Sequence, residues 1–326
     1  MIRYTIRRLL QMIPVLLGVS LLIFAMLFFT PGDPARTMLG THASEAQVYE
    51  LREQLGLNDT FLVQYVKYIT NMLKGDFGVS YISRMPVSQE ILSRFPTTVI
   101  FAVLSIVAAC IIGIPLGILS ATKQYTAVDD IVTSAAMVGV SVPTFWLGLM
   151  MMLLFALKLG WLPASGFYGP RYWILPTLTI GLASSAYVIR MTRSSMLEVI
   201  RKDYIRTARA KGQKESKVIW VHAFKNALIP IMTTIGLQFG MALGGQIVTE
   251  QVFAIPGLGK LMVDAISQRN YPIVRGGVML ICLSYCIVNL LVDLLYAAFD
   301  PRIRTMYAQT GKREKKKNGG VVNERG

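Results

Sequence analysis

The chain has 326 residues, of which 53% are hydrophobic and 16% are charged. That charged fraction is well below the ~25% of an average soluble domain. Crossing a ~30 Å hydrocarbon core takes about 20 apolar residues in a helix. Six nearly uncharged stretches approach or exceed that length, and they cover residues 9–30, 98–119, 131–159, 173–189, 226–248 and 274–297. We therefore predict an all-α integral membrane protein with about six transmembrane helices, which excludes a soluble globular fold.

The net charge is +15, a value that would suggest nucleic-acid binding in a soluble protein. Here the basic residues lie mainly in segments on one side of the predicted helices. With the N-terminus in the cytosol, the inner segments carry 22 Lys and Arg residues and the outer segments carry 9. Short cytosolic loops retain Lys and Arg, so both termini are expected in the cytosol. The partner of the basic tail, residues 301–326, is then membrane lipid and not nucleic acid.

The N-terminal helix, residues 1–30, is expected to stay in the mature protein. Its apolar stretch is longer than the core of a signal peptide, and a Pro-Gly-Asp-Pro stop follows it at 31–34. Residues 31–94 are predicted to form an extracytoplasmic cap. Within the cap, Ser44 and Gln47 have the spacing of a helix N-terminal capping box.

Residues 95–300 are expected to form a core with five further transmembrane helices. Gly113 and Gly117 would let the second helix approach a neighbour closely, and Pro115 should kink it. Pro143 removes a backbone donor within the third helix, which a neighbouring hydroxyl could partly replace. The spacing Gly236, Gly240 and Gly244 in the fifth helix fits packing within the chain, a two-fold partner interface or a pore wall.

Polar chemistry within the apolar stretches is sparse. Cys110, Cys282 and Cys286 all lie in predicted spans, which favours packing over a metal site or a disulfide framework. Asp293 is near the cytosolic end of the last helix, where Asn289 could share its hydrogen bonds. The sequence contains no phosphate-binding GxxxxGK[ST] loop and no GxSxG or HExxH motif. We expect no cofactor in this chain and no catalytic activity.

The cytosolic segment 190–225 is the most unusual part of the sequence. It contains ten Lys or Arg residues, yet apolar residues recur at helical spacing. Two short helices separated by Gly212 fit this pattern, because glycine readily adopts the positive φ of a helix end. A short basic helix projecting into the cytosol suggests docking onto an acidic groove of a partner protein.

This segment, Asp203 to Gly212 followed by Ala-Leu-Ile-Pro at 227–230, resembles the cytosolic loop of binding-protein-dependent ABC importer permeases. The likeness is to the oligopeptide and dipeptide branch, and to its dipeptide permease B-like subunits. Further motifs occur in the same order, and they are found at 7–14, 31–34, 55–57, 75–78, 190–197, 253–259, 271–272 and 300–304. The general Glu-Ala-Ala loop motif of such permeases matches only at Ala208 and Gly212.

The resemblance implies the type I ABC importer permease fold in the inner membrane of a prokaryote. It implies a second homologous permease, two ABC ATPase subunits that bind ATP and Mg, and an extracytoplasmic substrate-binding protein. The coupling helix would rest on an ATPase through Tyr204, Ile205, Arg206, Thr207, Ala208, Arg209, Ala210, Lys211 and Gly212.

Candidate residues for the translocation path are Ser141, Pro143, Phe145, Trp146, Gln238 and Gln246. Candidates for an external gate or binding-protein contact are Glu250, Phe253, Pro256, Gly257 and Gly259. The expected cargo is a dipeptide or oligopeptide. The same machinery importing a nickel chelate or glutathione remains an alternative, as does a secondary transporter working alone. A lone transporter would usually bury several ionisable groups midway across the membrane, and this sequence does not.

Overall fold

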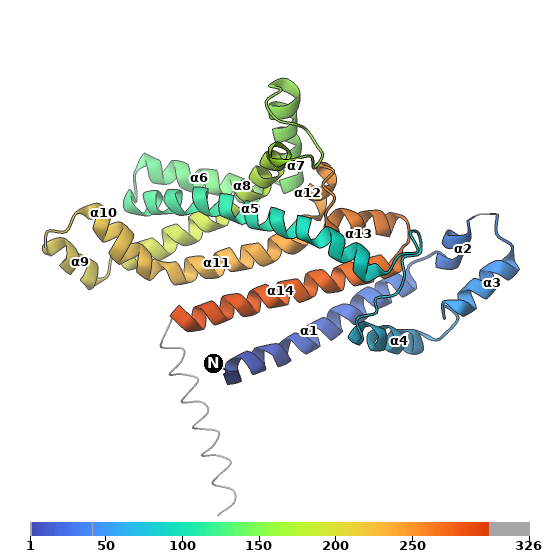
Figure 1. Cartoon of the computed structure of the whole chain (residues 1–326). Helices are drawn as coiled ribbons and strands as arrows, with labels where there is room; N and C mark the ends of the chain where they lie inside the picture. Colours follow the sequence, from blue (N-terminus) through green and yellow to red (C-terminus); the bar gives the residue numbers. More distant parts are fainter. Residues whose placement is uncertain (1, 41, 300–326) are drawn as a thin grey trace, which may run out of the picture.

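The computed structural model describes residues 2–40 and 42–299, and the predicted basic tail at 301–326 lies outside the described residues. The described part is helical almost throughout, and Figure 1 shows its long helices running roughly alongside one another. The long helices are α1 (Ile2–Phe29), α5 (Val87–Thr122), α8 (Pro170–Ile200), α11 (Phe224–Gly245) and α14 (Tyr271–Phe299). Each of these five is long and apolar enough to cross a membrane, and the number rises to six if a bent pair of shorter helices counts as one broken span.

The cap contains three short helices: α2 (Pro34–Leu39), α3 (Glu45–Gln54) and α4 (Phe61–Leu73). The predicted capping box is confirmed, because the Ser44 hydroxyl accepts from the Gln47 backbone and Gln47 accepts from the Ser44 backbone. Phe61 and Tyr65 of α4 lie against Phe24 of α1 in edge-to-face geometry. This aromatic contact attaches the cap to the N-terminal span. The next helix, α5, begins at Val87, before the expected domain boundary at residue 95.

The third predicted span, 131–159, is not one kinked helix. It divides into α6 (Ala127–Ser141) and α7 (Thr144–Met151), and a π-helical segment, η1 (Met152–Lys158), continues α7. The two halves meet at 103°, so α7 projects away from the bundle (Figure 1). The reason is Pro143, which has no N–H to donate and pushes the preceding Val142 into an extended conformation.

The remaining elements connect the spans. On the cytosolic side they are α9 (Asp203–Ala210), α10 (Glu215–Lys217) and the π-helical segment η2 (Val218–Ala223). On the outer side they are α12 (Ile247–Val252) and α13 (Leu258–Ser267). The fourth span is longer than the predicted 173–189, because α8 continues as a helix through the charged residues up to Ile200. Consequently, the first eleven residues of the expected loop 190–225 belong to α8.

Glycines allow the central helices to approach closely, as their spacing predicts. A Cβ on Gly113 would lie 2.7 Å from the Val188 Cβ, and one on Gly117 would lie 2.6 Å from the Thr192 Cβ. These positions bring α5 against α8. In α11, Gly236 faces Val292 and Gly240 faces Tyr285, both in α14. The α11 glycines were expected to serve packing within the chain, a two-fold partner interface or a pore wall. The structure shows that they pack within the chain.

Asp293 is paired differently from the prediction. Its carboxylate lies 3.2 Å from the guanidinium of Arg8, so the ion pair joins α14 to α1 near their cytosolic ends. The predicted partner, Asn289, is on the same helix. The three cysteines are free thiols, and among the described residues no cluster of His, Cys, Asp or Glu could hold a metal ion.

The close α5–α8 contact gives a testable prediction about stability. The substitution Gly117→Ala should destabilise the protein by about 1–3 kcal/mol, because the added methyl group has no space beside Thr192. Gly18→Ala is the matched control, since a Cβ on Gly18 would meet nothing within 4 Å. Thermal unfolding in mild detergent should show a lower midpoint for the first variant only. Equal midpoints for both variants would contradict the tight packing.

Candidate coupling surface and translocation path

The cytosolic segment has the predicted form of two helical pieces separated by Gly212. Helix α9 ends where the Lys211 N–H donates to the Thr207 carbonyl at 3.0 Å and the Gly212 N–H donates to Arg209 at 2.9 Å. Gly212 has a φ of 71°, a left-handed conformation that suits glycine. The chain then turns into α10, η2 and α11. Gly212 therefore reverses the chain direction and leaves α9 at the tip of the segment.

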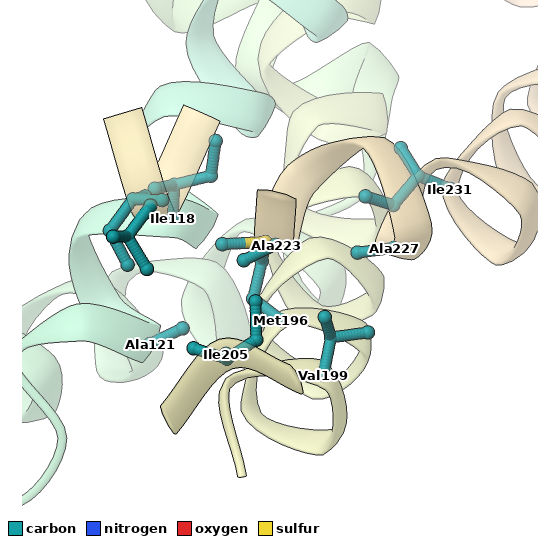
Figure 2. Packing of buried hydrophobic residues seen from close by; sticks show 10 residues of the cluster. Ile118, Ala121, Met196, Val199, Ile205, Ala223, Ala227 and Ile231 are labelled. Atoms are coloured by element: carbon teal, nitrogen blue, oxygen red, sulfur yellow. The ribbon is translucent and has the colours of Figure 1, made fainter. Parts of the chain in front are cut away.

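Helix α9 is amphipathic, and its buried side is anchored by Ile205. This side chain is fully buried in a hydrophobic cluster with residues of α5, α8, η2 and α11. Figure 2 shows Ile205 close to Met196 and Val199 of α8 and Ala121 of α5. Ile205 was expected to contact a partner, but its burial makes it the anchor of α9. The packing fixes the position of α9 relative to the ends of two membrane-spanning helices.

The opposite side of α9 faces solvent. Exposed side chains from the predicted contact set are Tyr204, Arg206, Thr207, Arg209, Ala210 and Lys211, while Ala208 is half-buried. Arg206 lies 3.9 Å from Asp203, and both side chains are largely exposed, so this pair contributes little stability. The surface is therefore compact and basic, and it is carried by a helix whose other face is held in the core.

Arg209 has a second role in this segment. Its guanidinium donates from two nitrogens to the Glu215 carboxylate, with a shortest distance of 2.7 Å. Hydrogen bonding to Glu215 raises the pKa of Arg209 above its usual value. The pair joins α9 to α10 across the Gly212 turn. Arg209 therefore stabilises the shape of the segment and is only partly available to a partner.

A buried ion pair next to this segment was missed by the sequence analysis. Asp129 in α6 accepts from Arg193 in α8 through two bonds of 2.7 Å. Ser120 and the backbone N–H of Tyr125 also donate to Asp129. These bonds fasten the α5–α6 turn to α8, about two turns before α8 ends at Ile200. The available sequence signal was a pair of arginines in the 190–197 motif and two adjacent acids, Asp129 and Asp130, at the start of an apolar stretch.

The candidate path residues fall into two groups. Ser141, Pro143, Phe145 and Trp146 surround the break between α6 and α7, and their side chains are exposed in the single chain. Gln238 and Gln246 in and after α11 are buried, with Gln246 only 2% exposed. Neither amide atom of Gln246 has a hydrogen-bond partner among the described residues. The residues around the break are therefore accessible to another molecule, whereas Gln238 and Gln246 are buried within the chain.

The break between α6 and α7 has a specific backbone consequence. Pro143 cannot donate to the Gly139 carbonyl, and the Ser141 hydroxyl bonds instead to the Met137 carbonyl at 3.0 Å. The predicted repair by a neighbouring hydroxyl thus does not reach Gly139. Irregular backbone at membrane depth is tolerated only against protein or a water-filled cavity, because lipid offers no hydrogen bonds. The break is therefore suited to a protein interface or an aqueous path.

The outer candidate residues are mostly internal. Glu250 is 1% exposed, and its carboxylate accepts from the Thr98 hydroxyl at 2.6 Å and from the Lys260 backbone at 3.0 Å. Burial raises the pKa of Glu250, although these bonds act in the opposite direction. Gly257 and Gly259 leave the space that this carboxylate occupies.

Phe253 is also buried, in a cluster with Phe101 and Leu175. Pro256 is half-buried and is the most accessible of the five. A partner could reach Glu250 or Phe253 only if the loop that carries them opened. Their observed role is to hold this loop against α5 and the outer half of the core.

Comparison with known proteins matches this architecture. Residues 113–305 match the family described as "Binding-protein-dependent transport system inner membrane component", and residues 1–102 match the N-terminal part of such membrane components. The chain is 45% identical to a protein of Salmonella paratyphi A named "Glutathione transport system permease protein GsiC", over 304 residues. It is 46% identical over 305 residues to the protein of that name in Escherichia coli strain K12. In both cases the match covers 93% of this chain and 99% of the relative.

A solved structure shares the fold. A chain of the MetNI methionine ABC transporter in an inward-facing conformation has a TM-score of 0.54 and 16% sequence identity. The similarity covers 65% of this chain and 97% of that one. At this identity the likeness concerns the fold alone. Together with the family match, it shows that the chain belongs to the binding-protein-dependent transport system inner membrane components and is a multi-pass permease subunit of a bacterial ABC importer.

Proposed function

We propose that this permease subunit imports short peptides, with glutathione among its cargoes. The observation that supports this most strongly is the 45–46% identity, along nearly the whole chain, to permeases named for glutathione transport. Glutathione is itself a tripeptide, so the relatives and the peptide branch of the resemblance indicate the same class of cargo. A peptide carries backbone donors and acceptors, which suits a mildly polar path.

The proposed assembly contains a second, homologous permease, two ABC ATPases and an extracytoplasmic substrate-binding protein. The exposed break at Pro143, with Phe145 and Trp146 beside it, supports a translocation path or permease interface there. The basic face of α9 supports docking onto an ATPase. In this proposal ATP and Mg bind to the ATPases, and this chain is a non-catalytic translocation subunit without a cofactor.

Coupling in this proposal passes from α9 into the membrane through buried contacts. Ile205 ties α9 to α5 and α8, and the Asp129–Arg193 pair ties α8 to the α5–α6 turn. Closure of the ATPases would move α9, and the core would move with it because Ile205 is fully buried among residues of α5, α8, η2 and α11. Helix α6, which ends at the Pro143 break, is then the element through which this movement reaches the path.

The first test is purification of the tagged full-length chain from its native membrane in mild detergent, with mass spectrometry of the bound proteins. We expect a second permease and ATPases with phosphate-binding loops. Uptake of labelled glutathione and labelled dipeptides is then measured in cells that lack this gene and in the same cells after the gene is restored. We expect uptake only in the cells that have the gene. Uptake of a nickel chelate alone, or transport by the chain without any partner, would contradict the proposal.

Gly212 should be required for coupling because of its backbone conformation. A Cβ there would meet nothing within 4 Å, so any effect of substitution comes from φ and not from a clash. Gly212→Val should lower glutathione uptake about tenfold, since a β-branched residue strongly resists positive φ. Gly212→Asn is the matched variant and should retain most uptake, because asparagine tolerates this region. Full uptake by the valine variant would show that the turn is not needed.

Arg206 is the best position to test docking of the ATPase. Arg206→Glu should reduce recovery of ATPase subunits roughly tenfold, because a carboxylate would face the acidic groove we propose. Lys123→Glu makes the same charge change at an exposed site on the α5–α6 turn and should leave recovery unchanged. Arg209→Glu is less informative, because Arg209 holds the Gly212 turn through its close contact with Glu215, whereas Arg206 makes only a 3.9 Å contact with the exposed Asp203. Equal recovery with Arg206→Glu and Lys123→Glu would place the contact elsewhere.

A further inference from the structure

A cavity of about 310 Å³ lies between the outer ends of α1 and α14 and the cap helices. Its lining includes Phe24, Asp33, Arg52, Asn58, Tyr271 and Arg275. Because α1 ends at Phe29, the cavity is at the depth where the hydrocarbon core gives way to lipid headgroups. The translocation path and the coupling segment described above do not use it.

The charges in the lining leave one cation without a counterion. Arg52 is paired with Asp33 at 2.9 Å, so these two neutralise each other. Arg275 forms no ion pair within the part of the chain that the structure describes, and its Nε is buried without a hydrogen-bond partner. The guanidinium is held over the rings of Phe24 and Tyr68, at 5.5 Å and 5.1 Å from their centroids. The cation is therefore fixed in place beside the cavity.

A second unpartnered donor lies on the same face of α14. The Tyr271 hydroxyl is buried without a hydrogen-bond partner, and Tyr271 is four residues before Arg275, which is one helical turn. Tyr271 is also the first residue of α14, where the helix dipole favours negative charge. Arginine can only donate hydrogen bonds and the Tyr271 hydroxyl can donate one, so an acceptor with negative charge would complement both groups.

We propose that this cavity binds a phosphate group, with Arg275 and Tyr271 as its ligands. A guanidinium fork matches phosphate oxygens, and the depth of the cavity is that of phospholipid phosphates in the outer leaflet. Leu22, Met26 and Phe29 of α1 are each 65% or more exposed, so α1 also presents apolar side chains that suit contact with lipid. The phosphate can come from an anionic phospholipid or from free phosphate.

The experiment uses the full-length chain in mild detergent. It is titrated separately with phosphatidylglycerol, phosphatidylcholine and inorganic phosphate, and thermal unfolding and native mass spectrometry report binding. Arg275→Gln removes the charge, and Tyr271→Phe removes only the hydroxyl and keeps the ring. Arg171→Gln is the control. Arg171 is an exposed arginine on the outer side that does not line the cavity, and it donates to the Trp161 carbonyl.

We expect phosphatidylglycerol to be retained and to raise the unfolding midpoint of the wild type and the control. Arg275→Gln should weaken that binding at least about tenfold, as expected for loss of a charged hydrogen bond, and Tyr271→Phe should weaken it less. A free-phosphate site would be supported by a different result. Inorganic phosphate would stabilise the wild type but not Arg275→Gln, and the two lipids would bind equally. If Arg275→Gln does not fold, Tyr271→Phe carries the test. Unchanged affinity for both phosphate sources in the variants that fold would overturn the proposal.

Discussion

Contact between α5 and α8 is the interaction on which the rest of this permease depends. Gly113 and Gly117 of α5 lie against Val188 and Thr192 of α8 with no room for a side chain. Lipid tails are as apolar as leucine, so membrane helices associate through such close packing and not through the hydrophobic effect. Half of the most apolar stretch of α8 is buried within the chain, against 11% for α1 and for α14. Helix α8 is thus the central element, and α1 and α14 form an outer layer that is little buried within the chain.

The central position of α8 explains how a helix outside the membrane can act on one inside it. Helix α9 follows α8 after only two residues, and Ile205 is packed against Met196 and Val199 on the last turns of α8 (Figure 2). Arg193, which pairs with Asp129, lies on the same helix about one turn before Met196. A buried ion pair of this kind contributes little net stability, but breaking it by removing one partner leaves an uncompensated charge. It fastens the start of α6 to α8, which suits the coupling proposed above.

Features carried by local sequence were predictable, and features that depend on distant contacts were not. The Gly212 turn and the Ser44 capping box follow from a few neighbouring residues, and both occur in the structure. The Asp129–Arg193 pair joins residues 64 positions apart, and no local pattern links them. Pro143 predicts an interruption of the helix, but not the 103° angle between its two halves. Glu250 resembles a surface acid in sequence, and it is internal because Gly257 and Gly259 are separately placed to admit it.

The outer layer of α1 and α14 and the central helices carry different features of the molecule. The exposed break at Pro143 and the basic face of α9 both belong to elements packed on α5 and α8. The cavity with Arg275 lies in the outer layer, where α1 and α14 meet the cap, and the Arg8–Asp293 pair joins those two helices at their opposite ends. The cap is attached to this layer by aromatic contacts to Phe24, the same ring over which Arg275 lies. A phosphate bound at Arg275 would therefore act on the cap through the shared contact with Phe24, and on the central helices through α14, which packs against α11.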